Sequence, residues 1–144
     1  MKRLIVYTDG ACSNNQEFDK SVGGWAFILK YQDKIKKKSG RVEKTTNNRM
    51  EILAVIEALK NIKKYDVETI IHSDSSYVIN TITKNWKRNK NNDLWDELDL
   101  LLSKFSNLKF IKVKGHSNDE LNNLVDEMAV LETKQEIWKV LIPF

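Results

Sequence analysis

The spacing of apolar positions predicts strands in the first third of the chain. Residues 3–11 are apolar on both faces, which is typical of a central strand, and residues 24–29 are expected to form a second strand. Residues 35–42 are expected to form a third strand, and the consecutive Lys36, Lys37 and Lys38 indicate a solvated sheet edge. Because these strands follow one another closely, we expect an antiparallel meander.

The apolar period then changes to that of a helix. Apolar residues recur at spacings of three and four along Ile52, Val55, Ile56, Leu59 and Ile62. Strands are expected at 67–71 and 108–113, and further helices at 74–82, 93–105 and 118–131. The order β-β-β-α-β-α-α-β-α predicts an α/β fold, with a mixed five-stranded sheet flanked by helices.

Length and composition indicate one globular domain. The chain has 144 residues, of which 41% are hydrophobic, so we expect a single domain over residues 1–144. No stretch is long and apolar enough to predict a membrane span. Residues 136–144 form an apolar C-terminal tail, expected to pack back on the core. The alternative is an exposed patch that meets a partner or a second copy.

Cysteine content and net charge indicate the cellular compartment and the kind of partner. The one cysteine, Cys12, excludes an intrachain disulfide and fits a reducing compartment, so a cytoplasmic location is expected. We interpret Cys12 as a small buried residue rather than a nucleophile. A net charge of +4 is compatible with a polyanionic partner, and we expect a monomer.

Four acidic residues stand in distinctive contexts, and each alone has an ordinary explanation. Asp9 can belong to a turn after a strand. Glu51 fits a capping box with Asn48 at a helix start, and Asp126 can lie on the solvent face of the last helix. For the fourth acid, Ser73 or Asp74 can cap the helix that follows.

The joint placement of these acids predicts a metal site. Asp9 is expected at the end of a central strand, Asp74 just past another, and Glu51 at the start of the helix between them. Ligands gather at such strand ends in α/β sheets. An all-oxygen carboxylate set suits Mg²⁺ or Mn²⁺, and no cysteine–histidine spacing indicates zinc.

Six segments together resemble the type 1 ribonuclease H family, in the family's order and over about residues 3–131. They are Thr8-Asp9-Gly10-Ala11-Cys12, Thr45-Thr46-Asn47-Asn48-Arg49-Met50-Glu51, Ser73-Asp74-Ser75-Ser76-Tyr77-Val78, Asp93-Leu94-Trp95, Val113-Lys114-Gly115-His116 and Asp126-Glu127-Met128-Ala129. The resemblance implies a ribonuclease H-like fold. It also implies an endonuclease that cuts the RNA strand of RNA–DNA hybrids and leaves 5′-phosphate and 3′-hydroxyl ends.

The resemblance also assigns catalytic roles. It implies two Mg²⁺ ions, with Mn²⁺ as an alternative, held by Asp9, Glu51, Asp74 and Asp126. Asp9 would bridge the ions, with Asp126 on the nucleophile side and the other two on the leaving-group side. Two ions can clamp an in-line displacement at phosphorus. His116 would assist proton transfer or product release.

Matched positions further imply substrate contacts. Asn15, Asn48 and the backbone near Cys12 would contact RNA, whose 2′-hydroxyls distinguish it from DNA. Thr46 and Asn47 would lie towards the DNA strand. The resemblance places three further contacts at Ser76, where many relatives carry glutamine, and at Trp86 and Lys87 in the DNA-side channel. The alternative for Trp86 is a core aromatic.

Two segments depart from the family pattern. Residues 16–21 lack the glycine- and proline-rich turn of many relatives, which affects the placement of Asn15. Residues 86–92 stand where many bacterial relatives have a longer basic helix and loop, so we expect weaker, more salt-sensitive hybrid binding. Two alternatives stay open: a ribonuclease H domain within a reverse transcriptase, and a non-catalytic module that binds hybrids. The start at Met1 and the intact acid set favour a free-standing enzyme.

Overall fold

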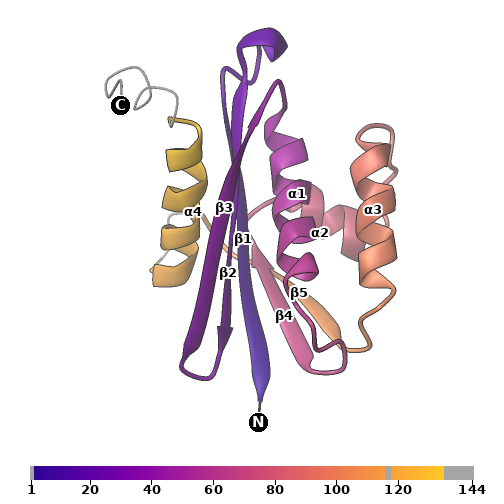
Figure 1. Cartoon of the computed structure of the whole chain (residues 1–144). Coiled ribbons are helices and arrows are strands. Elements are labelled where there is room, and N and C mark those ends of the chain that lie inside the picture. Colours follow the sequence, from indigo (N-terminus) through magenta and orange to yellow (C-terminus); the bar gives the residue numbers. More distant parts are fainter. Residues whose placement is uncertain (1, 116–117, 135–144) are drawn as a thin grey trace.

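Five strands form one mixed sheet in the computed structural model, which describes residues 2–115 and 118–134. The strands are β1 (Arg3–Ser13), β2 (Val22–Tyr31), β3 (Lys34–Glu43), β4 (Glu68–Ser73) and β5 (Leu108–Lys112). Their order across the sheet is β3-β2-β1-β4-β5 (Figure 1). β1, β2 and β3 pair antiparallel, whereas β4 runs parallel to β1 and β5 parallel to β4. The expected fold and meander are confirmed.

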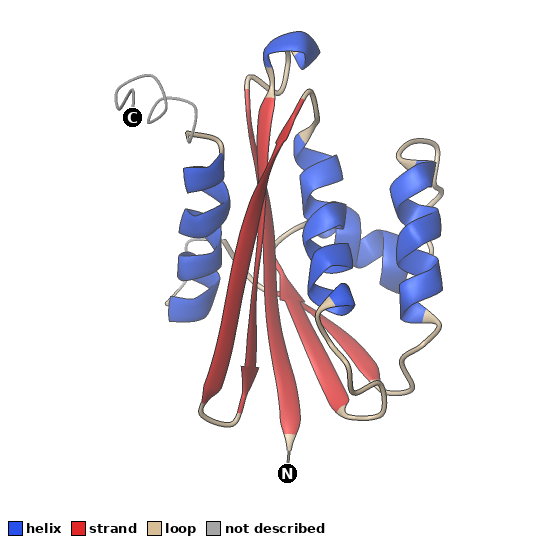
Figure 2. Ribbon diagram, in the orientation of Figure 1, coloured by secondary structure: helices blue, strands red, loops and turns tan. Residues whose placement is uncertain are grey.

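Helices cover both faces of this sheet. They are α1 (Asn47–Lys60), α2 (Ser76–Thr83), α3 (Asn92–Leu102) and α4 (Glu120–Glu132), with a short 3₁₀ turn, η1 (Phe18–Lys20). The first three helices lie on one face and α4 lies on the other (Figures 1 and 2). None of the helices in the described ranges is long and apolar enough to cross a membrane.

The alternation of side chains along β2 explains this arrangement. Trp25, Phe27 and Leu29 belong to a core shared with α1, whereas Ala26 and Ile28 belong to a second core. Because successive side chains of a strand point to opposite faces, an apolar run fills both. The second core includes residues of β1 and α4 and is made of Tyr7, Ala26, Ile28, Val125 and Ala129.

The strand boundaries correct one expectation. β2 keeps pairing with β1 up to the Ser13–Val22 partners, so β1 continues past Asp9 instead of ending there. On its other side β1 pairs with β4 only as far as Tyr7 and His72. The β4 side of β1 is therefore without a strand partner beyond Tyr7, which leaves room for other groups beside Asp9.

The helix starts correct two more expectations. The hydroxyl of Thr46, not Asn48, caps α1 by accepting from Arg49 N at 3.2 Å. The hydroxyl of Ser75 caps α2 by accepting from Val78 N at 3.2 Å, so neither Ser73 nor Asp74 is that cap. Hydroxyls take over the capping, and the carboxylates of Glu51 and Asp74 are available for other contacts. The expectations about the tail at 136–144 lie outside the described residues.

Candidate metal centre

Three carboxylates from separate elements converge at the end of β4. Asp9 comes from β1, Glu51 from the second turn of α1, and Asp74 directly follows β4. One oxygen of each lies within 4.8 Å of one oxygen of the others. Asp9 and Glu51 are buried and Asp74 is half-buried, so the group is enclosed by protein on most sides.

Gly10 lets α1 approach β1 closely enough to form this group. A Cβ at Gly10 would lie 2.4 Å from the backbone of Met50 and Glu51, closer than any real contact. The N–H of Gly10 donates to Oε1 of Glu51 at 2.8 Å. Strand and helix backbones thus touch at this point, and the contact directs Glu51 towards Asp9.

Gly24 lets α4, the helix that carries the fourth acid Asp126, approach β2 closely. A Cβ at Gly24 would lie 2.1 Å from the carbonyl oxygen of Ala129, so α4 packs directly on the backbone of β2. Ala129 lies about one turn beyond Asp126 on α4. Asp126 is half-buried, and it is close enough to Asp9 to raise the pKa of that acid. The alternative that Asp126 lies on the solvent face is therefore wrong.

The electrostatics of the group favour a bound cation. Burial, then the charge of Glu51, the hydrogen bond with Asp126 and the charge of Asp74 raise the pKa of Asp9. Burial and the charge of Asp74 also raise the pKa of Glu51, against the opposing effect of the Gly10 N–H. Oδ2 of Asp9 is buried and has no hydrogen-bond partner in the described part of the chain. Crowded, buried carboxylates of this kind are stabilised by a cation.

The donor chemistry restricts which cation fits. The converging ligand atoms are carboxylate oxygens, which suit hard divalent ions such as Mg²⁺ and Mn²⁺. Gly115 lies beside this group, because a Cβ there would be 3.4 Å from Oδ2 of Asp74. The next residue, His116, lies outside the described residues, so its predicted role stays a prediction.

Predicted substrate residues gather at the start of α1. Oδ1 of Asn15 accepts from the N–H of Asn47 at 2.9 Å, which joins the loop after β1 to this helix. Asn15 and Asn48 are exposed, and Thr46 and Asn47 are half-buried. The structure therefore brings these four residues together, although the loop lacks the turn that many relatives have there.

Three other predicted contacts lie on and after α2. Ser76 is the exposed first residue of that helix, two positions after Asp74. Trp86 is 48% exposed, so the alternative of a core aromatic is wrong. Lys87 is also exposed, and residues 84–91 join α2 to α3 without a helix of their own. This connection agrees with the expected absence of a basic protrusion. Cys12 is half-buried rather than buried.

Sequence reasoning did not find two sets of contacts around the site. Tyr7 stacks on His72 and donates to Asp119, and Arg49 forms a bidentate pair with Asp93. The first set carries a signal in the sequence, because Tyr7 and His72 each stand two residues before a predicted metal ligand. The second set carries none, because 44 residues separate the partners.

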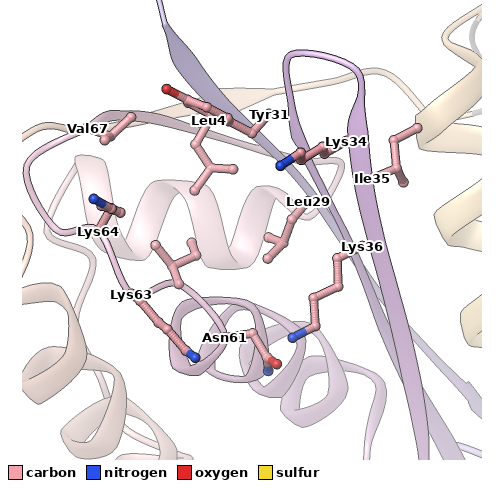
Figure 3. Close-up of a pocket in the computed structure, with 11 residues that line it drawn as sticks. Leu4, Leu29, Tyr31, Lys34, Ile35, Lys36, Asn61, Lys63, Lys64 and Val67 are labelled. Carbon is pink, nitrogen blue, oxygen red and sulfur yellow. The ribbon is translucent and has the colours of Figure 1, made fainter.

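A separate hollow lies away from the carboxylates, where β1 begins and β2 and α1 end (Figure 3). It measures about 560 Å³ and is lined by apolar side chains such as Leu4 and Leu29, with lysines such as Lys34 and Lys63 at its rim. Among the residues that the structure describes, no carboxylate lines it. It therefore has no part in the candidate metal centre.

Comparisons with known proteins agree with this geometry. The RNase H family model matches residues 1–134. The chain is 46% identical to a ribonuclease H of Caldicellulosiruptor saccharolyticus, covering 90% of this chain and 94% of the relative. It is 44% identical to a ribonuclease H of Acetivibrio thermocellus, covering 96% and 100%.

Solved structures show the same fold at lower identity. The N-terminal RNase H domain of a Mycobacterium tuberculosis protein superposes with a TM-score of 0.81 at 16% identity, covering 97% of this chain and 99% of that one. LC11-RNase H1, solved in complex with an RNA/DNA hybrid, gives a TM-score of 0.78 at 20% identity and covers 93% and 99%. From the family match and the identity to the curated relatives, we conclude that this chain belongs to the ribonuclease H family of nucleases.

Proposed function

We propose that the protein is a metal-dependent endonuclease that hydrolyses the RNA strand of RNA–DNA hybrids and leaves 5′-phosphate and 3′-hydroxyl ends. The observation that carries this proposal is the buried carboxylate group around Asp9, with its raised pKa values and unpartnered oxygen. The family supports the activity, and the hybrid bound by LC11-RNase H1 supports the substrate.

Asp9 is the central carboxylate of the proposed metal site. Glu51, Asp74 and Asp126 all contribute to the raised pKa of Asp9, and Asp9 is the residue that would be shared by two Mg²⁺ ions. When bound, two such ions activate a water and stabilise the leaving oxygen of an in-line phosphodiester hydrolysis. Asp126 belongs to α4, which lies on the opposite side of the sheet from α1, the helix that carries Glu51.

The cluster at the start of α1 is the proposed RNA-reading face. Asn15 and Asn48 offer exposed amides at the start of α1, the helix that carries Glu51, and amides can both donate to and accept from a 2′-hydroxyl. Thr46 and Asn47 would extend this face towards the DNA strand. Ser76, Trp86 and Lys87 would contact the duplex further along, and His116 would assist proton transfer or product release.

Cleavage of a labelled hybrid tests the proposal. Wild-type protein with Mg²⁺ or Mn²⁺ is expected to cut the RNA strand, and Asp9→Asn to reduce cleavage by at least about a thousandfold. Asp33→Asn, at an exposed acid in the β2–β3 turn, is the control and should cleave normally. Equal cleavage by wild type and Asp9→Asn would contradict the proposal. Hybrid binding without cleavage in either metal would instead support the non-catalytic module.

A further inference from the structure

Two aromatic side chains stack on each other close to the carboxylates of Asp9 and Asp74. Tyr7 of β1 and His72 of β4 are partners in the parallel pairing. Their rings stack with centroids 4.5 Å apart and planes inclined by 15°. Asp9 and Asp74 each follow two residues later along the chain. Because side chains alternate along a strand, Tyr7 and Asp9 lie on the same face of β1.

The position of this pair is restricted by its surroundings. Nδ1 of His72 lies 3.2 Å from the carbonyl oxygen of Val6, and a carbonyl only accepts, so Nδ1 carries the proton in this contact. Tyr7 is only 7% exposed and packs in the core beneath α4, with Val125 and Ala129. The stacked ring and the core together hold the Tyr7 hydroxyl in one direction.

That hydroxyl reaches the residue that caps α4. Tyr7 donates to Oδ2 of Asp119, across 112 residues of sequence. The other oxygen, Oδ1, accepts from the N–H groups of Leu121 at 3.2 Å and Asn122 at 3.4 Å. One carboxylate therefore ties the start of α4 to β1, two residues before Asp9.

Two further contacts hold the other end of α4. Gly24 lies directly against the carbonyl of Ala129, and the hydroxyl of Ser39 donates to Oε2 of Glu132 at 2.6 Å. Asp126 lies between these contacts and the Tyr7–Asp119 bond, two turns after the cap. Of these three contacts, the cap contact comes from β1, the strand that also carries Asp9.

We propose that Tyr7 is a positioning residue for metal binding: through Asp119, its hydroxyl sets the position of α4 along β1 at which Asp126 meets Asp9. The inference rests on the proposed function, because it concerns the same metal site. Tyr7 itself need not touch an ion. Loss of its hydroxyl would leave all four carboxylates present and loosen the position of one of them.

Metal binding by Tyr7→Phe tests this inference, because phenylalanine keeps the ring and its stacking and removes only the hydroxyl. Mn²⁺ affinity, measured from the free-Mn²⁺ signal in electron paramagnetic resonance, is expected to fall about tenfold. The Mg²⁺ concentration for half-maximal cleavage should rise by a similar factor. At saturating Mg²⁺, kcat should return to near the wild-type value, because no ligand is missing.

Two comparison variants separate positioning from general destabilisation. Tyr77→Phe removes another part-buried hydroxyl, which accepts from Asn91 and Trp95 at 3.1 Å between α2 and α3. It should lower the melting temperature and leave Mn²⁺ affinity unchanged. Asp119→Ser keeps a hydroxyl oxygen for the cap but is too short to reach Tyr7, so it should weaken Mn²⁺ binding as Tyr7→Phe does. The double variant should be no weaker than either single variant, because both remove one interaction.

The outcomes distinguish this inference from the proposed function. If wild-type protein binds Mn²⁺ no more tightly than Asp9→Asn, the proposed metal site fails and the inference fails with it. If wild type binds Mn²⁺ and Tyr7→Phe binds it equally well, the inference alone is overturned. Additive losses in Tyr7→Phe and Asp119→Ser would overturn it too.

Discussion

The N–H of Gly10 donates a 2.8 Å hydrogen bond to Oε1 of Glu51, which lies 41 residues further along the chain. The bond joins the middle of β1 to the second turn of α1 and turns Glu51 away from its own helix end. It is possible only because position 10 has no side chain. One contact thus sets both the packing of the helix and the position of a proposed metal ligand.

The variant Gly10→Ala should disturb stability and activity together. Its Cβ would lie 2.4 Å from the Met50 and Glu51 backbone, and such overpacking typically costs about 1–3 kcal/mol. The displacement of Glu51 should also reduce hybrid cleavage by at least about tenfold. Thermal unfolding and cleavage at saturating Mg²⁺ measure the two effects.

Gly40→Ala is the matched control for that variant. Its Cβ would lie 2.4 Å from the Trp25 ring, and Gly40 lies on β3, two strands away from Gly10. It should also lower the melting temperature but retain cleavage below that temperature. Wild-type cleavage by Gly10→Ala would show that the Gly10 contact does not position Glu51.

Without metal, Asp9→Asn should be more stable than wild type. Asparagine keeps the shape of the side chain and removes a charge that burial and three neighbouring acids disfavour. In EDTA at pH 8, the free energy of unfolding should rise by about 1–3 kcal/mol. Added Mg²⁺ should then stabilise wild type but not the variant, because a ligand stabilises the state that binds it.

Thermal unfolding with and without Mg²⁺ measures this effect, with Asp33→Asn as the exposed control. The control should stay within about 0.5 kcal/mol of wild type in both conditions. A metal-free Asp9→Asn protein that melts below wild type would mean that the Asp9 charge is compensated by protein groups.

The Arg49–Asp93 pair predicts a pH-dependent contribution to stability. Arg49 binds both oxygens of Asp93, at 3.0 and 2.7 Å, and the pair lowers the pKa of Asp93 to about 2. A lowered folded-state pKa stabilises the fold above the unfolded value of 3.8 and ceases to do so as the pH falls towards 2. Because Asp93 is exposed, Asp93→Asn should cost only about 0.5 kcal/mol at pH 6.

Urea unfolding of wild type and Asp93→Asn at pH 6 and at pH 3 checks this prediction. The difference between the two proteins should shrink at the lower pH. Added salt at pH 6 should also reduce it, because the pair is solvent-exposed. A difference that persists at pH 3 and in high salt would assign the role of Asp93 to something other than this ion pair.

Lys87→Ala should weaken hybrid binding without affecting the fold. Lys87 is exposed on the connection between α2 and α3, so its loss should leave the melting temperature unchanged. If it contacts a phosphate, the slope of log affinity against log salt should become shallower by about one. The slope is measured from hybrid binding by proteins that also carry Asp9→Asn, so that the hybrid is not cleaved.

Lys63→Ala supplies the control for that measurement, because Lys63 lines the hollow where α1 ends. It should leave both the affinity and the slope unchanged. An unchanged slope for Lys87→Ala would mean that Lys87 does not contact the hybrid.

The expectation of weaker hybrid binding has its own test, a side-by-side comparison with a relative that has the longer basic loop. Equal affinity and equal salt slope in the two proteins would contradict it.

The sequence by itself determined the order of the elements and the chemical type of the site. The strand period and the helix period are local properties, so the change from β3 to α1 could be read directly. The expected order of nine main elements matches the structure. The acids Asp9, Glu51 and Asp74 were also predicted to meet, because strand ends in such a sheet meet at one edge.

Tertiary structure alone decided how each carboxylate is held. The capping box at Glu51 was a reasonable local prediction, but a distant strand offers Glu51 a better partner in Gly10. Asp126 lies beside Asp9 because Gly24 and the Tyr7–Asp119 bond place α4. These contacts join residues far apart in the chain, and their geometry depends on strand register and on close backbone approach. Neither leaves a periodic signal in the sequence, so only the folded chain reveals them.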